Sequence, residues 1–377
     1  MTSEVRTFAT DATDPYERGR ELGAGCAQQV HEAFGSYQEL WAAFSVVPEE
    51  IRAVGTAVLD PIESFSPSLR AELAGLAAGS GLAEWQVGAL NARTELLALG
   101  DQRLVAAGRQ PGDPAECSTL VRIPRDGSPL TAQTWDWHTP LRDSWFVATL
   151  RLPGGRTVRT LTEYGIAGKI GVAADGPRGV VGVHFNALRH AADCGDGGVP
   201  VHLVARRILD EADTLDAAVK VAAAAEVSAS AAVTVTAPAE ASGRWEAATI
   251  ELHPGGPSVQ TQREADDGCW LAHTNHFVAR GPDADSLSPA ASTTVERLER
   301  VSRVAHTHIG SAQAVADALA THDLGPRSVC VHGFPDAPLG LRTATLAVAV
   351  AEPAAGRLHV HAGRPCDAHR DTWWSGG

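Results

Sequence analysis

One cysteine stands where its surroundings would make its thiol a nucleophile. Cys117 follows a polar segment rich in glycine and proline (residues 108–114) and precedes an apolar, β-branched run, so we expect an exposed loop to lead directly into a strand. A cut between Glu116 and Cys117 would leave a free α-amino group beside the thiol. An α-amine has a pKa of about 7.7–8.0 and a thiol one of about 8.5, so the amine could take up the thiol proton. The alternative is a buried packing residue, which is what most cysteines in cytosolic proteins are.

Two further side chains would lie beside this thiol if the next segments form a hairpin. Residues 118–137 contain two β-rich runs around a Pro-Arg-Asp-Gly turn, which predicts paired antiparallel strands. Asp136 would return to the start of the first strand, where a carboxylate could hold the new ammonium group or orient the thiol. Thr119 shares a strand face with Cys117, so its hydroxyl could position the carbonyl that is cut, or it could simply pack. The tryptophans on either side of Asp136 would point to the opposite face, into the core.

Two residues of opposite charge precede this region. Arg93 and Glu95 lie near the end of the expected N-terminal helices. They could form an ion pair that ties these helices to the sheet, or they could line a pocket. We favour the structural role.

The histidines near the C-terminus raise the alternative of metal chemistry. His359 and His361 are two apart on an expected strand and share a face, and three further candidates follow: Cys366, Asp367 and His369. These residue types are zinc ligands. The chain has no HExxH sequence and no Cys/His spacing typical of a structural site, so we expect no metal. A metal-dependent hydrolase and a papain-type enzyme, in which a histidine pairs with Cys117, remain alternatives.

The elements that must position these residues change in type along the chain. Residues 14–100 have apolar residues at helical spacing, with expected helices over 14–44, from Ser66 onwards and over 82–99. The expected strands are 118–123, 130–137, 145–152, 157–164, 180–185, 231–236, 245–252, 270–273, 343–350 and 358–361. The later expected helices are 199–212, 215–225, 293–306 and 312–322. Hairpins with helices grouped between them predict two sheets packed face to face with helices outside.

Composition narrows the classes of partner. The chain has 377 residues, 44% of them hydrophobic, so it can bury a large core. Its net charge of −14 (31 basic minus 45 acidic residues) argues against nucleic acid or an anionic membrane as the main partner. The sequence shows no transmembrane run, no signal peptide and no disulfide framework. We therefore expect a cytoplasmic protein, and the richness in alanine, glycine and arginine suggests a bacterial source.

Several short segments occur together in an order that indicates a known family: Asn91-Ala-Arg-Thr-Glu95, Cys117-Ser-Thr119, Gln133-Thr-Trp-Asp-Trp137 and His273-Thr-Asn-His-Phe277. They resemble the acyl-CoA:6-aminopenicillanate acyltransferase family of N-terminal-nucleophile (Ntn) hydrolases, which includes the β-alanyl-amine hydrolases. The resemblance extends over nearly the whole chain, through Pro15-Tyr-Glu-Arg-Gly-Arg-Glu-Leu-Gly23, Gly165-Ile-Ala-Gly-Lys-Ile-Gly171, Phe185-Asn-Ala-Leu188, Gly198-Val-Pro-Val-His202 and Gly363-Arg-Pro-Cys366.

The resemblance implies an α+β fold, the αββα Ntn-hydrolase sandwich, made as an inactive precursor. The thiol of Cys117 would attack the carbonyl of Glu116 in an N-to-S acyl shift. Hydrolysis would then release two chains that stay associated as one domain: the helical segment 1–116 and the nucleophile-bearing portion 117–377. No metal or organic cofactor is implied, although a CoA thioester is a possible co-substrate.

The resemblance also assigns residues. The side-chain amide of Asn275 matches a family position that donates to the oxyanion, and Asp136 lies in the family's Trp-Asp context. Two departures stand out. Glu116 replaces the glycine of the penicillin enzyme, where strain is easier to accommodate, and Val172-Ala-Ala-Asp175 lacks an asparagine often found there.

These observations predict a self-cleaving cysteine amidohydrolase or acyltransferase. It would pass an acyl group from a small N-acyl amine, an amino acid derivative or an acyl thioester to Cys117, and then to water or a small amine. Its partners would be these small molecules and its own two fragments. Because Glu116 precedes the nucleophile, a non-cleaving binding or scaffold protein of the same fold remains an alternative.

Overall fold

A short strand and a group of helices form the N-terminal part of the protein. The computed structural model describes residues 4–108, 116–176, 178–280, 292–307 and 310–377, so most of the loop expected at residues 108–114 lies outside the described residues. The elements before Cys117 are β1 (Thr7–Thr10), α1 (Pro15–Gly25), α2 (Ala27–Ala43), α3 (Pro48–Ala57), α4 (Leu59–Phe65), α5 (Pro67–Ser80), α6 (Glu84–Asn91) and α7 (Arg93–Ala106).

The helical prediction for this part is correct in type and wrong in its divisions. The helix expected over residues 14–44 is two helices, because the backbone at Cys26 leaves helical geometry (φ −126°, ψ 24°). The helix expected over 82–99 is likewise divided at Ala92. Ser66 caps α5 as predicted, since its hydroxyl accepts from the N–H of Leu69.

Two large sheets make up the rest of the chain. The first has the order β1-β4-β5-β6-β7-β8-β9-β10, with β4 (Trp145–Arg151), β5 (Arg156–Glu163), β6 (Ile170–Asp175), β7 (Arg178–Ala187), β8 (Ala231–Pro238), β9 (Trp245–Leu252) and β10 (Ser258–Thr261). The second has the order β11-β12-β2-β3-β13-β14-β15, with β11 (Arg263–Ala265), β12 (Gly268–His273), β2 (Ser118–Pro124), β3 (Leu130–His138), β13 (Thr343–Glu352), β14 (Arg357–Ala362) and β15 (Trp373–Gly376). Neighbouring strands pair antiparallel, except that β1 runs parallel to β4.

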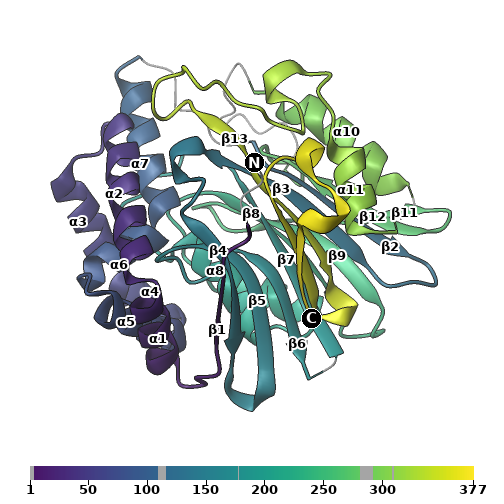
Figure 1. Ribbon diagram of the computed structural model, residues 1–377, viewed down its shortest axis with the longest axis horizontal. Coiled ribbons are helices and arrows are strands. Elements are labelled where there is room, and N and C mark those ends of the chain that lie inside the picture. Colours follow the sequence, from purple (N-terminus) through teal and green to yellow (C-terminus); the bar gives the residue numbers. More distant parts are fainter. Residues whose placement is uncertain (1–3, 109–115, 177, 281–291, 308–309) are drawn as a thin grey trace.

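The two sheets pack face to face and helices cover their outer faces. β2, β3 and β13 of the second sheet contact β6, β7 and β9 of the first. The first sheet is covered by α8 (Val201–Glu211) and α9 (Leu215–Ala223), and the second by α10 (Thr294–His306) and α11 (Ala312–Leu319). In Figure 1 the N-terminal helices lie at one side of this sandwich and α10 and α11 at the other. The expected αββα architecture is therefore confirmed.

Burial on both faces explains the composition of the central strands. Every residue of β8 and all but the last residue of β13 are buried, and both strands are rich in Ala, Val and Thr. Strands covered on two sides lose the alternation that marks a half-exposed strand. The strands β1, β6, β10, β11 and β15, all of which are only three to six residues long, were not predicted from the sequence. Among the described helices, none is both long and apolar enough to cross a membrane.

The N-terminal helices are joined to the sandwich through close packing and a buried charge cluster. α1 and α5 cross so closely that a Cβ on Gly19 would lie 1.9 Å from the carbonyl oxygen of Glu72. The Glu72 carboxylate accepts from Arg18 on α1 (2.7 and 2.9 Å) and from Arg206 on α8 (2.8 and 2.9 Å). All three side chains are buried, so this cluster connects α1, α5 and α8.

Candidate active site

Cys117 lies directly before β2, at the end of the N-terminal segment. The residue is buried, and its Sγ donates to the carbonyl oxygen of Asp136 at 3.6 Å. The hairpin register, in which Ser118 faces Thr134, brings Asp136 back to Cys117. The hairpin and the nearness of Asp136 to the thiol are therefore as predicted.

The surroundings of the thiol favour its protonated form. Burial, followed by the negative charge of Asp136, raises the pKa of Cys117 to about 11, although Lys169 and Gln133 act in the opposite direction. The Asp136 carboxylate is held by Thr345 on β13, whose hydroxyl donates to Oδ1 at 2.6 Å. In the uncut chain the thiol therefore needs a base, or a raised pH, before it can act as a nucleophile.

Arg297 on α10 contacts both carbonyl oxygens that flank the expected cut. Its Nη1 lies 2.8 Å from the carbonyl oxygen of Glu116, 3.0 Å from that of Cys117 and 2.9 Å from Ser118 Oγ. The side chain is fully buried. A charged donor in such a place is well suited to stabilise a negative charge that develops on a carbonyl oxygen.

The side chain of Glu116 also contacts Arg297. It is 3% exposed, and its Oε2 accepts from Thr293 Oγ1 at 3.2 Å and lies 3.6 Å from Arg297 Nε. The residue that replaces the expected glycine is thus accommodated through an ion pair with the arginine that also binds its carbonyl oxygen.

Thr119 contacts the site through a second side chain. Its hydroxyl donates to Oδ1 of Asn186 at 2.7 Å, and Nδ2 of Asn186 donates to the carbonyl oxygen of Cys117 at 3.1 Å. Asn186 lies on β7, so this contact spans the two sheets. Of the two roles considered for Thr119, the contact supports neither directly: its hydroxyl orients Asn186, which binds the carbonyl oxygen of Cys117.

Asn275 follows β12 and faces Arg297. Its Oδ1 accepts from Arg297 Nη2 at 3.1 Å, its Nδ2 donates to the carbonyl oxygen of Ala187 at 2.9 Å, and its backbone N–H donates to Thr294 Oγ1 at 2.8 Å. Arg297 therefore contacts the Glu116 carbonyl oxygen directly, whereas Asn275 is linked to this oxygen through Arg297. To serve as an oxyanion donor, the amide would use its second N–H or leave Ala187.

Arg93 and Glu95 have separate partners. Arg93 pairs with Glu163 on β5 at 3.0 Å, and Glu95 Oε1 accepts from the N–H of Val201 at the start of α8 at 2.9 Å. Burial raises the pKa of Glu95 to about 7. In place of the ion pair considered for them, the two residues make two contacts that tie α7 to the sandwich, in agreement with the structural role we favoured.

Lys169 shares Glu163 with Arg93 in a buried cluster beside the tryptophans. Its Nζ lies 3.0 Å from Glu163 Oε2 and 3.8 Å from the ring centroid of Trp135. Burial lowers the pKa of Lys169 to about 8. Both tryptophans next to Asp136 are buried in the core, as predicted.

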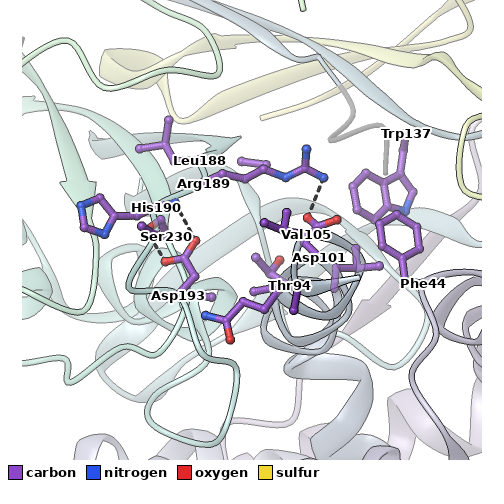
Figure 2. Close-up of a pocket in the computed structure, with 17 residues that line it drawn as sticks. Phe44, Thr94, Asp101, Val105, Trp137, Leu188, Arg189, His190, Asp193 and Ser230 are labelled. Carbon is purple, nitrogen blue, oxygen red and sulfur yellow. Dashed lines mark hydrogen bonds and ion pairs between the residues drawn. The ribbon is translucent and has the colours of Figure 1, made fainter. Parts of the chain in front are cut away.

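A cavity of about 430 Å³ lies beside Trp137. Apolar side chains of α7, of β3 and of the segment after β7 line much of it: Leu97, Ala98, Val105, Trp137 and Leu188. Figure 2 shows polar groups at its edges, where Asp101 pairs with Arg189 at 2.7 Å and Asp193 accepts from Ser230 at 2.6 Å. Ala187, which accepts from Asn275, also lines the cavity, so the cavity lies next to the Arg297 cluster.

The sequence profile of the acyl-coenzyme A:6-aminopenicillanic acid acyl-transferase family matches residues 124–367, which is 244 of the 377 residues. The chain belongs to this family. The match contains Asp136, Asn186, Asn275 and Arg297 and begins seven residues after Cys117. The resemblance inferred from the short segments is thereby confirmed.

The chain is also similar to individual proteins of known sequence or structure. The 40 kDa form of acyl-coenzyme A:6-aminopenicillanic-acid-acyltransferase from Emericella nidulans is 29% identical over 265 residues, which cover 70% of this chain and 67% of the relative. An N-acylethanolamine-hydrolyzing acid amidase orthologue from Caenorhabditis elegans has a TM-score of 0.44 at 13% identity and covers 68% of this chain and 99% of its own. Penicillin V acylase from Agrobacterium tumefaciens has a TM-score of 0.41 at 14% identity and covers 65% and 83%.

Asn186 and Arg297 are among the side chains that contact Glu116 or Cys117 without having been predicted from the sequence. Asn186 lies in Phe185-Asn-Ala-Leu188, which we noted for its resemblance without assigning a role. Arg297 lies in an amphipathic helix, where an arginine is expected to be solvated, and nothing in its spacing from Cys117 marks it. A charged residue on the buried face of α10 is the signal that could have found it.

The metal-binding set considered at the C-terminus does not assemble. His359 is held by Glu352 and Ser375, at 2.8 and 2.7 Å, and Cys366 joins a different group of side chains, described below. Cys117 Sγ donates to the Asp136 carbonyl, and no histidine among the described residues forms a papain-type pair with this thiol.

Proposed function

We propose that this protein is a self-cleaving cysteine amidohydrolase or acyltransferase that acts through an acyl-Cys117 intermediate. One observation supports it above the others: a buried thiol directly follows a carbonyl whose oxygen accepts from the buried Arg297 at 2.8 Å. Family membership supports the coarser class of amide hydrolase or acyltransferase.

The first reaction is the cleavage of the chain. Sγ of Cys117 attacks the carbonyl carbon of Glu116 through a five-membered ring, and Arg297 stabilises the negative charge on the carbonyl oxygen. The C–N bond breaks, the thiol proton passes to the departing amine, and a thioester remains. Water then hydrolyses the thioester, which leaves Glu116 as a C-terminal carboxylate and Cys117 with a free thiol and α-amine.

The second reaction uses the new N-terminus on an external acyl donor. The α-amine of Cys117 takes the thiol proton, Sγ accepts the acyl group, and water or a small amine removes it. Asp136 would hold the resulting ammonium group. The neighbouring apolar cavity fits the acyl part of a small N-acyl amine, an acylated amino acid derivative or an acyl thioester such as one of CoA, with no resident cofactor required.

Denaturing electrophoresis with intact mass determination tests the first reaction. Wild-type protein should give fragments of about 12 and 27 kDa, in proportion to 116 and 261 residues of a 39.4 kDa chain, and Cys117→Ala should stay at full length. Cys26→Ala is a matched control, because this cysteine is also buried, and it should cleave. A full-length wild-type band would instead support the non-cleaving scaffold.

Acyl transfer is tested separately on the cleaved protein. Incubation with acyl-amines and acyl-CoA thioesters should add one acyl mass to the fragment that begins with Cys117. If turnover persists without an adduct, survives Cys117→Ala and is lost to a chelator, the protein is a metal-dependent hydrolase and the proposal is wrong.

A further inference from the structure

Four potential metal ligands gather at the end of the second sheet where β13 begins and β14 ends. His322 follows α11, Cys330 and His332 precede β13, and Cys366 follows β14. One ligand atom from each lies within 4.8 Å of all the others. Among the residues that the structure describes, this is the group of three or more His, Cys, Asp and Glu side chains placed to share an ion. No residue of the cleavage segment belongs to it.

The distances from His332 to the other three ligands are close to the edges of a tetrahedron. His332 Nε2 lies 3.0 Å from His322 Nε2, 3.5 Å from Cys366 Sγ and 3.7 Å from Cys330 Sγ. A tetrahedral zinc ion with Zn–N of about 2.0–2.1 Å and Zn–S of about 2.3 Å needs ligand separations of roughly 3.3–3.8 Å. Small shifts of the side chains would therefore complete the coordination.

We propose that His322, Cys330, His332 and Cys366 bind one Zn²⁺ ion in a closed, four-coordinate structural site. Two thiolates and two neutral imidazoles are a preferred zinc donor set, and four protein ligands leave no open position for a substrate. Binding displaces the two thiol protons to solvent, and the two thiolates balance the charge of the ion. His322 is exposed and Cys330 is buried, so the ion has a route in from solvent.

The neighbour of His332 must change partner when the ion binds. Arg364 Nη1 lies 2.7 Å from His332 Nδ1, which can accept this bond only while it carries no proton. Ligation through Nε2 leaves the ring proton on Nδ1, so Nη1 has to turn away. Arg364 keeps its two bonds to Asp367, at 2.7 and 3.2 Å, which makes that change small.

The site would join two segments that support Asp136. Val331, which lies between two of the ligands, makes two hydrogen bonds to Thr345. Its N–H donates to Thr345 Oγ1 and its carbonyl accepts from the Thr345 N–H, each at 3.0 Å. Thr345 in turn donates to Asp136. Next to Thr345, the register of the β13–β3 pairing shifts. In the segment that carries Cys366, Gly363 N–H donates to Leu346 O at 2.9 Å. Zinc would hold these loops in place, which is the use of a structural site.

Metal content of the full chain, purified without an affinity tag, tests the proposal. Elemental analysis should find about one zinc per chain, and Co²⁺ substituted for it should give the intense d–d and thiolate charge-transfer absorption of a tetrahedral sulfur-containing site. Cys330→Ser combined with Cys366→Ser should lose the metal and the spectrum. Cys194→Ser combined with Cys269→Ser, at two half-buried cysteines outside the group, should keep both.

Thermal unfolding of wild-type protein supplies a readout that needs no variant to fold. A chelator should lower Tm by roughly 5 °C, and Zn²⁺ but not Mg²⁺ should restore it. Substoichiometric zinc with no cobalt spectrum would refute the proposal. So would a mass 2 Da below that of the reduced chain in metal-free protein together with a linked Cys330–Cys366 peptide, because these cysteines would then form a disulfide.

Discussion

Arg297 makes several contacts with the segment around the Glu116–Cys117 peptide bond. It binds the carbonyl oxygens of Glu116 and Cys117, pairs with the Glu116 carboxylate and holds Asn275. A planar guanidinium can reach several acceptors at once, whereas a lysine ammonium on its longer, flexible stem presents a point charge. The geometry around the Glu116–Cys117 peptide bond therefore depends on an arginine and not only on a positive charge.

Replacing Arg297 should slow self-cleavage without preventing folding. Arg297→Lys keeps the charge but loses the bridging geometry, and we expect a rate roughly 10²–10³-fold lower, as when one oxyanion donor is removed. Time-resolved electrophoresis of newly translated chain measures this rate. Arg300→Lys, on the same helix and paired with the half-exposed Asp323, is the control and should cleave normally. Wild-type kinetics in Arg297→Lys would exclude the assigned role.

The thiol of Cys117 should make self-cleavage pH-dependent. Because burial and the charge of Asp136 raise its pKa to about 11, the protonated form dominates at neutral pH, and the thiolate fraction grows about ten-fold per pH unit below that value. Cleavage of freshly made precursor should therefore accelerate from pH 6 to pH 9. Asp136→Asn removes the charge that raises the pKa and should move the profile to lower pH. A rate independent of pH over this range would contradict the prediction.

At the scale of elements, the Arg18–Glu72–Arg206 cluster determines how the N-terminal helices join the sandwich. Burial alone would raise the pKa of Glu72, but the two arginines outweigh it and the pKa is lowered. The carboxylate therefore stays charged. Each arginine comes from a different helix, so the cluster couples α1 and α5 to α8.

Glu72→Ala should be strongly destabilising. It would leave two buried guanidinium groups without their shared carboxylate, and we expect a loss of about 3–5 kcal/mol in the free energy of unfolding. Glu84→Ala removes an exposed partner of Arg70 and should cost less than about 1 kcal/mol. Urea denaturation of both variants, in the Cys117→Ala background to keep the chain uncut, measures the two values. Equal stabilities would show that the cluster contributes little.

At the scale of the whole molecule, the expected cut would divide a continuous core. The largest hydrophobic cluster contains residues on both sides of position 116, among them Tyr37 and Trp41 before it and Trp135 and Trp137 after it. The ion pairs Glu72–Arg206 and Arg93–Glu163 also cross the division. These contacts do not depend on the peptide bond at the site of cleavage.

The two fragments should consequently remain together after cleavage. Native mass spectrometry or size-exclusion chromatography should report the mass of the whole chain from a sample whose denaturing gel shows both fragments. Glu72→Ala should weaken this association, whereas Glu84→Ala should not. Separate elution of the fragments under native conditions would mean that the shared core is insufficient.

Much of the fold, and the proximity of Cys117 and Asp136 in the candidate site, follow from local sequence. Strand and helix types come from residue periodicity, which neighbouring residues establish among themselves. The meeting of Cys117 and Asp136 also follows, because a hairpin fixes which residues face each other over a separation of 19 positions. Family membership adds the layered architecture, since the order of the short segments along the chain is enough to indicate the family.

Tertiary structure alone decided the remaining contacts. Arg297 reaches the Glu116 carbonyl from 181 positions away, and the four proposed zinc ligands lie on two separate connecting segments with no recognisable spacing. Such meetings depend on how whole sheets and helices stack, because the chain between two such residues can vary in length without changing where they lie. The sequence by itself thus determined the hairpin that follows Cys117 and the family, whereas packing decided which charges surround this thiol and where the cysteines and histidines gather.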